Sequence, residues 1–227
     1  MKQMLKETLI IFLITLLAGA ALGSIYMITK EPIAVQEQLA KDRAYQAVFT
    51  NANTFIEESN FDSEHAQVVL KNIDPEHDYS GTDVDMFASA YKDEELLGFV
   101  ITVTNHNGYG GDITFTMGIR LDGTMNGISI TSISETAGLG MKASDVLAPQ
   151  FVDKSAESRF NVTKTGAVYP TDIDAISSAT ITSKAVVDGV NTGCAYYQYR
   201  LSQYQTDENS IPNLSNQGII EGGGADA

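Results

Sequence analysis

Residues 113–132 have the sequence ITFTMGIRLDGTMNGISITS, and this stretch decides the fold class. Apolar side chains alternate along the run before the Asp122-Gly123 pair, and a second run returns after it. An Asp-Gly pair between two such runs is a strong signal for a β-hairpin. The stretch therefore predicts two antiparallel strands, Ile113–Leu121 and Thr124–Ser132.

The same period of two extends over residues 84–133. Leu97–Thr104 is rich in β-branched residues, and Asp85–Tyr91 precedes it across the charged turn Lys92–Glu95. Short connections between successive strands favour antiparallel neighbours. We therefore expect an antiparallel meander.

Helices are predicted before and after these strands. Apolar spacing indicates a helix over Val35–Phe49, a short helix near Ala143–Phe151, and a long amphipathic helix from Thr182 to about Tyr204. The apolar face of the long helix is formed by Val186, Val190, Gly193, Tyr197 and Leu201. Cys194 lies within this helix and is expected to be a small core residue. Val68–Leu70 is a possible short strand.

The N-terminal region contains an uncharged run of 22 residues, Thr8–Thr29. A helix of roughly 20 apolar residues crosses the core of a bilayer. Lys2 and Lys6 precede the run, whereas Lys30 is followed at once by Glu31 and an acidic chain. The positive-inside rule therefore predicts a single-pass protein of the cell membrane, with a cytoplasmic N-terminus and an extracytoplasmic main domain.

A cleaved signal peptide is the alternative, because residues 18–21 are small and resemble a cleavage site. The apolar run continues to Ile28, which is long for a signal sequence and favours an uncleaved anchor. We expect an α+β fold: an N-terminal transmembrane helix followed by one extracytoplasmic domain with a mainly antiparallel sheet and packed helices. The expected divisions are 1–30 for the cytoplasmic N-terminus and anchor, 31–60 for a linker helix region, 61–205 for the domain, and 206–227 for a disordered tail.

Composition excludes several classes of function. The chain of 227 residues has a formal charge of −15, and a surface this acidic repels nucleic acid. Cys194 is the only cysteine, which excludes a disulfide framework and any metal site built from several thiolates. His106 has no acidic or thiol partner at metal-ligand spacing, so we expect a solvated side chain and no metal site.

The segment with the most chemical potential is residues 174–184, DAISSATITSK. Serines and threonines gather where a short strand meets the long helix. Helix starts have unpaired N–H groups and bind phosphate readily, and Lys184 would add positive charge. The alternative is plain N-capping, for which Ser and Thr are preferred residues.

Three motifs in this order resemble the FMN-binding domain family. Residues 174–180 are similar to its D-x-x-[ST]-G-A-T signature, residues 107–111 to its G-Y-G-G turn, and residues 134–140 to its E-T-P-G-L-G loop. Together with one N-terminal transmembrane helix, they resemble the G subunits of Rnf ion-translocating electron transport complexes. The resemblance to C subunits of the sodium-pumping NADH:quinone reductase is more distant.

The resemblance implies a covalent cofactor. A flavin transferase that uses FAD would link the FMN phosphate to Thr180, with Asp174 as part of its recognition sequence. The residues implied near the phosphate are Ser177, Ser178, Ala179 and Thr182. The residues implied in a loop against the flavin are Glu135, Thr136, Gly138, Leu139 and Gly140. Tyr109, Gly110 and Gly111 are expected to make a tight loop more than a contact with the cofactor.

The chain departs from the family pattern at two positions. Ser178 replaces the glycine before Ala-Thr, and a serine is strained there if the position requires a positive φ. Ala137 replaces the proline of the second loop, which loosens the loop without removing a functional group.

The resemblance implies an electron relay with no catalytic residues of its own. In such complexes, electrons pass between ferredoxin and NAD while sodium ions or protons are pumped. The implied partners are flavin- and iron–sulfur-containing membrane subunits, the transferase and membrane lipid. The alternatives are a stand-alone flavinylated carrier, a non-redox single-pass sensor, and an anchor protein that has lost its flavin.

Overall fold

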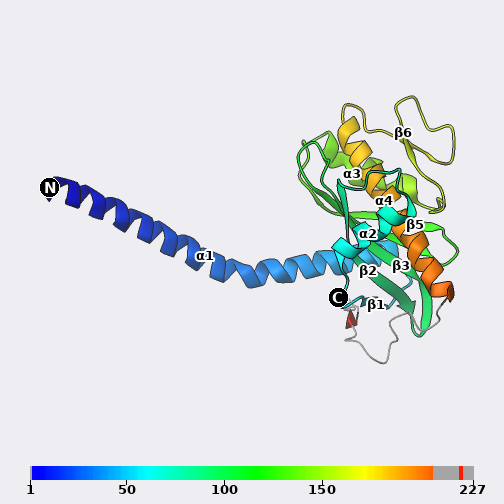
Figure 1. Ribbon diagram of the computed structural model, residues 1–227, viewed down its shortest axis with the longest axis horizontal. Helices are drawn as coiled ribbons and strands as arrows, with labels where there is room; N and C mark the ends of the chain where they lie inside the picture. Colours follow the sequence, from blue (N-terminus) through cyan, green and yellow to red (C-terminus); the bar gives the residue numbers. More distant parts are fainter. Residues whose placement is uncertain (1, 207–219, 222–227) are drawn as a thin grey trace, which may run out of the picture. The chain divides into compact units, whose positions relative to one another are not determined.

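The structure is a computed structural model that describes residues 2–206 and 220–221; Figure 1 labels its elements. Two compact units divide the chain, residues 1–41 and residues 42–227. The first unit consists of helix α1 (Lys2–Val48) up to Lys41. Within the described residues, α1 is the one helix long and apolar enough to cross a membrane.

Helix α1 confirms the helix expected over residues 35–49 and joins it to the apolar run without a break. Pro32 lies inside the helix, where it cannot donate a backbone hydrogen bond. The side chains of the apolar run are exposed, including Leu16 at 56% and Leu17 at 63%. Apolar side chains in such numbers are stable in lipid and not in water.

An antiparallel sheet is the centre of the second unit. Its strands are β1 (Thr54–Glu57), β2 (Thr82–Lys92), β3 (Glu95–Asn105), β4 (Ile113–Arg120), β5 (Met125–Ile133) and β8 (Ile220–Glu221). Their order is β5-β4-β3-β2-β1-β8, and every neighbouring pair is antiparallel. The predicted meander is therefore confirmed over β2–β5.

The hairpin between β4 and β5 turns where the Asp-Gly pair predicted it. The Arg120 amide donates to the Thr124 carbonyl at 2.9 Å, and Gly123 has a φ of +79°. A positive φ costs glycine little because it has no Cβ. The hydrogen-bonded turn holds the two alternating runs in register.

Helices α4 (Thr180–Thr206) and α2 (Ser63–Ile73) cover one face of the sheet, as Figure 1 shows. Phe99, Phe115 and Met117 point from the strands into this core and contact the helices' buried residues. Burying one such side chain fully contributes about 1.5–3 kcal/mol. The predicted long helix is thus confirmed, with Val186, Val190 and Tyr197 buried.

The other face of the sheet is covered by the end of α1. Tyr45, Val48 and Phe49 pack there with Phe55 of β1 and Val100 of β3. Val100 follows Phe99 in the chain, so the alternation of β3 supplies both cores. The compact unit accordingly starts at Asp42 and includes β1, within the range 31–60 expected to be a linker region.

The strand expected at Val68–Leu70 is wrong, because these residues lie inside α2. Asp62 caps this helix by accepting from the amides of Glu64 and His65. Ala66, Val69 and Leu70 are buried at helical spacing. The cap and this spacing outweigh the β propensity of the Val-Val pair.

The remaining elements frame the loops after β5. A 3₁₀ turn (Gly140–Lys142), α3 (Ala143–Val146) and a second 3₁₀ turn (Ala148–Phe151) confirm the predicted short helix. Strands β6 (Asn161–Thr163) and β7 (Asp172–Asp174) pair in parallel. The expected disordered tail, 206–227, lies largely outside the described residues; within it, β8 pairs with β1.

Candidate functional site

The turn between β7 and α4 is built around a buried serine. The Ser183 hydroxyl accepts from the Ile176 amide at 2.9 Å and donates to the Ala179 carbonyl at 2.9 Å. Ser183 is fully buried and lies one helical turn after Ala179. Serine often bonds the carbonyl four residues earlier in a helix, and the spacing of Ala179 and Ser183 is the sequence signal for this contact.

Ser178 has a φ of +64°, in the left-handed region. The family glycine at this position therefore has a physical reason, and the strain expected for a serine is present. Ser178 is exposed, so its side chain has room although its backbone is strained.

The other hydroxyls of the segment do not cap α4. Among the described residues, those of Ser177, Ser178, Thr180 and Thr182 accept no hydrogen bond from the first turn of the helix. The residue before the helix is Ala179, which has no side-chain oxygen. The amides at the start of α4 thus lack a side-chain partner, and plain capping does not explain the cluster.

A cavity of about 510 Å³ lies against the start of α4. Its lining residues are Tyr109, Glu135, Thr136, Leu139, Gly140, Ser178, Ala179, Thr180, Ile181 and Thr182. The volume falls within the range of small-molecule sites. The fold thus brings the 134–140 loop and the 174–180 segment together, as the resemblance implied, and adds Tyr109 from the 107–111 turn.

Of the residues that the resemblance implied for the cofactor or its attachment, Ser177, Gly138 and Asp174 lie outside the cavity lining. Gly138 has a φ of +78° and makes the turn that aims Leu139 and Gly140 at the cavity. The backbone of Asp174 is held by Gln150, which accepts from its amide at 2.8 Å and donates to its carbonyl at 3.1 Å. Oδ1 of Asp174 is buried and has no hydrogen-bond partner among the described residues.

Glu135 and Thr182 place two polar groups in the cavity wall. Both are buried, and Oε1 of Glu135 accepts from the Gly110 amide at 3.3 Å. A Cβ on Gly140 would lie 2.7 Å from the Glu135 Cβ and 2.8 Å from the Thr182 hydroxyl oxygen. Gly140 therefore lets both polar side chains lie close against the loop backbone in the cavity wall.

Comparison with known proteins identifies the family. An FMN-binding domain model matches residues 108–195. The G subunit of the Na(+)-translocating ferredoxin:NAD(+) oxidoreductase complex of Acetobacterium woodii is 32% identical over 198 residues, covering 87% of this chain and 93% of the relative. The chain belongs to the family of G subunits of ion-translocating oxidoreductase complexes. Membership in a family of membrane complexes, together with the apolar run of α1, indicates a membrane-anchored protein.

Other members of this family match over most of their length. The G subunit of the proton-translocating ferredoxin:NAD(+) oxidoreductase complex of Clostridium ljungdahlii is 30% identical and is covered to 80%, with 77% of this chain aligned. Among solved structures, Shewanella oneidensis NqrC gives a TM-score of 0.48 at 20% identity, covering 55% of this chain and 62% of that one. The two ferredoxin-linked relatives are named for different ions, so family membership leaves the ion open.

Lys184 lies beside a different cavity, of about 540 Å³, together with Arg159 and Asn107. It does not line the cavity at Thr180. The expectation that Lys184 adds charge at the phosphate position is therefore not supported by the cavity lining. Ile181 separates the two cavities and lines both.

Cys194 is confirmed as a core residue. Its side chain is buried in the sheet–helix core, and burial raises the pKa of its thiol to about 12. A thiol that stays protonated at neutral pH is a poor nucleophile. Cys194 thus has a packing role in the domain.

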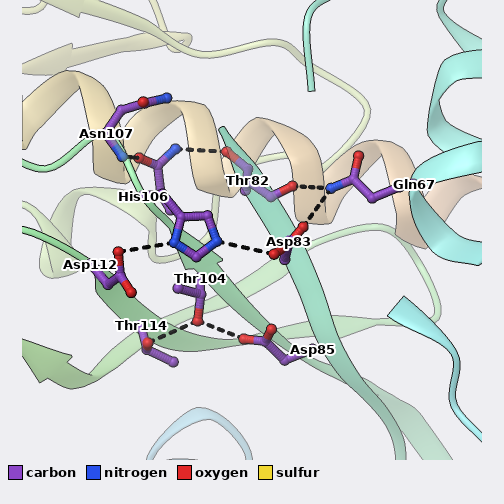
Figure 2. A network of polar contacts seen from close by, with 10 residues as sticks. Gln67, Thr82, Asp83, Asp85, Thr104, His106, Asn107, Asp112 and Thr114 are labelled. Carbon is purple, nitrogen blue, oxygen red and sulfur yellow. Dashed lines mark hydrogen bonds and ion pairs between the residues drawn. The ribbon is translucent and has the colours of Figure 1, made fainter. Parts of the chain in front are cut away.

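The side chain of His106 is exposed, as expected, but its ring also contacts two carboxylates. Its Nδ1 lies 2.9 Å from an oxygen of Asp112, and its Nε2 lies 3.0 Å from an oxygen of Asp83 (Figure 2). Asp83 lies in β2, 23 residues before His106. Antiparallel pairing of β2 with β3 brings Asp83 next to His106, and this contact cannot be read from local sequence spacing.

Proposed function

We propose that this chain is the flavoprotein subunit of an Rnf-type ferredoxin:NAD oxidoreductase, with FMN joined to Thr180 through a phosphoester. The observation that carries the proposal is the cavity at Thr180, where the half-buried threonine meets Glu135, Thr136 and Gly140. This cavity lies within the family-model match at residues 108–195.

The residues present fit this cofactor. The start of α4 offers amides without a side-chain cap beside Thr180, which suits a phosphate. The wall offers the carboxylate of Glu135 and the hydroxyl of Thr182, which suit a ring edge with hydrogen-bond donors and acceptors. Leu139 and Ile181 give apolar surface for a flat ring.

Attachment requires a partner, because an unassisted threonine hydroxyl is a poor nucleophile. A flavin transferase would supply FAD: the Thr180 oxygen forms a bond to the FMN phosphorus, the pyrophosphate bond of FAD breaks, and AMP leaves. A base on the transferase takes the hydroxyl proton. Asp174, outside the cavity, is then part of the surface that the transferase recognises, while Ser177, Ser178 and Ala179 complete the turn that presents Thr180.

Once bound, FMN supplies one- and two-electron transfer, which connects one-electron iron–sulfur partners with two-electron partners. The chain's own residues bind and orient the ring and limit its contact with water. Redox partners are the flavin- and iron–sulfur-containing membrane subunits of the complex. Lysines 2 and 6 before the apolar run favour a cytoplasmic N-terminus, with residues 42–206 outside and the helix in lipid.

The test is to co-express the full chain with a flavin transferase and to image a denaturing gel under ultraviolet light. We expect fluorescence in the wild type, and loss of it in Thr180→Ala, because only a covalent bond survives denaturation. Thr50→Ala is the matched control: it removes an exposed threonine hydroxyl outside both the cavity lining and the 174–180 signature, and it should stay fluorescent. A dark wild-type band with an active transferase would overturn the proposal.

A further inference from the structure

A chain of hydrogen bonds joins α2, β2 and the loop after β3, and Tyr109 of this loop lines the cavity at Thr180. Gln67 of α2 donates to Asp83 at 3.0 Å, and Asp83 in turn contacts His106. On the other side of the ring, His106 contacts Asp112 at 2.9 Å. Figure 2 shows the imidazole lying between the two carboxylates.

This geometry specifies the protonation state of the histidine. A carboxylate only accepts hydrogen bonds, so a ring that contacts one at each nitrogen must donate from both. His106 is therefore an imidazolium ion when both contacts are made. The hydrogen bond to Asp112, followed by the one to Asp83, raises the pKa of His106 above its ordinary value.

The β3–β4 ladder closes the loop 106–112 at Asn105 and Ile113, and the His106–Asp112 contact adds a side-chain link directly above that pair. Three of the seven residues of this loop are glycines, so the side-chain link restrains a segment with unusual backbone freedom. The closed loop packs against the cavity wall. The Gly110 amide donates to Oε1 of Glu135, and a Cβ on Gly108 would lie 2.9 Å from the same oxygen.

We propose that His106 is a positioning residue for the flavin cavity. As an imidazolium held by Asp83 and Asp112, it fixes the loop 106–112, and the Gly110 amide of that loop orients the Glu135 carboxylate. The role of Glu135 toward a flavin rests on the proposed function, whereas the link between His106 and Glu135 does not.

The charged groups around His106 set the direction of the pH effect. Asp83 and Asp85 face it from β2 and Asp112 from its own loop, while Gln67 on α2 is neutral. The carboxylate of Asp85 accepts a hydrogen bond from the Thr104 hydroxyl at 2.6 Å, so it interacts less with the His106 ring than Asp83 does. Because the pKa of His106 is raised, the clamp is complete below the ordinary histidine pKa and is lost as the pH rises through the raised value.

The experiment is a pH titration of the full chain, without flavin, by NMR over about pH 5 to 9. Ring labelling of histidine gives signals from three residues, and His106→Gln identifies the one that belongs to His106. Tyr109-Gly110 is the only Tyr-Gly pair in the sequence, so carbonyl-labelled tyrosine with amide-labelled glycine selects the Gly110 amide.

We expect the Gly110 amide shift to follow a titration curve with the same midpoint as the His106 ring. In Asp112→Asn the amide oxygen still accepts but the charge is gone, so both midpoints should move together to lower pH. Asp122→Asn is the matched control, since Asp122 is 66% exposed and Asp112 is 65% exposed; it should move neither. In Glu135→Gln the Gly110 amide should still show the same titration curve. This outcome shows that the curve reports on His106 and not on the Glu135 carboxylate.

A Gly110 amide that does not respond, or that keeps its midpoint in Asp112→Asn, would overturn the proposal. With flavin attached, the pH dependence of the flavin reduction potential should show a break at the same midpoint, displaced in Asp112→Asn. An unbroken dependence in the loaded protein would refute positioning of the cofactor by His106. A chain that accepts no flavin would refute the proposed function. The Gly110 titration would then still decide whether His106 fixes the loop 106–112.

Discussion

At the scale of the residue, the turn before α4 combines a strained position with a tightly bonded one. Ser178 occupies a left-handed conformation that is unfavourable for a side chain, and the two hydrogen bonds of Ser183 hold the same turn closed. Strain that persists in a folded protein is maintained by its surroundings. Here the buried serine hydroxyl fixes the backbone that presents Thr180.

Ser178→Gly should stabilise the domain by about 1 kcal/mol, because glycine adopts a positive φ without steric cost. Denaturant unfolding, followed by near-ultraviolet circular dichroism of the ten tyrosines, measures this. Ser177→Gly is the control: Ser177 is exposed too but is not among the residues with positive φ, so it should lose about 0.5–1 kcal/mol through backbone entropy. Equal effects of the two substitutions would contradict the strain argument.

At the scale of the element, α4 approaches the sheet closely through two glycines. A Cβ on Gly189 would lie 2.8 Å from the Phe115 ring, and one on Gly193 would lie 2.2 Å from the sulfur of Met117. Phe115 and Met117 are both fully buried. The packing distance between helix and sheet therefore depends on both glycines, but the two neighbours differ in stiffness.

Gly189→Ala should destabilise the domain by about 2 kcal/mol, because an aromatic ring in a packed core cannot move aside. Gly193→Ala should cost clearly less, since the flexible thioether of Met117 can turn away. The gain of about 1 kcal/mol in helix propensity is common to both substitutions and does not affect the comparison. Thermal or denaturant unfolding of the two variants provides the comparison. A larger loss in Gly193→Ala would show that the backbone, and not the facing side chain, sets the distance.

The elements that were predictable from the sequence are those with a strong local signal. Period-two alternation and the Asp122-Gly123 turn predicted the meander, and helical spacing predicted α4. Val68–Leu70, a possible short strand from the sequence, is helical in the structure. The Asp62 cap is a local signal for a helix there, whereas the burial of Leu70 against the rest of the core is tertiary information.

The candidate site was predictable only in part, for a related reason. The family resemblance pointed to the two segments that line the cavity, and the positive φ at Ser178 was anticipated from the missing glycine. The clamp on His106 was not predictable, because Asp83 is supplied by strand pairing and not by sequence spacing. The absence of Ser177 from the cavity lining likewise depends on the direction of the turn, which composition does not encode.

At the scale of the whole molecule, charge and the anchor define the setting. Residues 32–227 contain 11 lysines and arginines against 27 aspartates and glutamates, so their formal charge is −16. The apolar run before them has two lysines on its N-terminal side. This asymmetry is the basis for the proposed orientation across the membrane.

Thiol labelling in intact cells tests that orientation. The native Cys194 is buried and its pKa is raised to about 12, so it should react little with a membrane-impermeant maleimide. Glu76→Cys introduces an exposed thiol in the domain and should be labelled from outside, whereas Gln3→Cys should be labelled only after lysis. The reverse pattern would place the domain in the cytoplasm.

The last turn of α1 also determines where the chain can be shortened. Gly98 and Gly118 have no side chains, and Phe49 and Val48 pack into the space this leaves on the sheet. A Cβ on Gly98 would lie 2.8 Å from the Phe49 ring, and one on Gly118 would lie 2.8 Å from the Val48 Cβ. A truncated protein that begins near Asp42 retains these two side chains. One that begins at Thr54 would expose an apolar patch on the sheet. Its aggregation would then result from the truncation and would not be a property of the full chain.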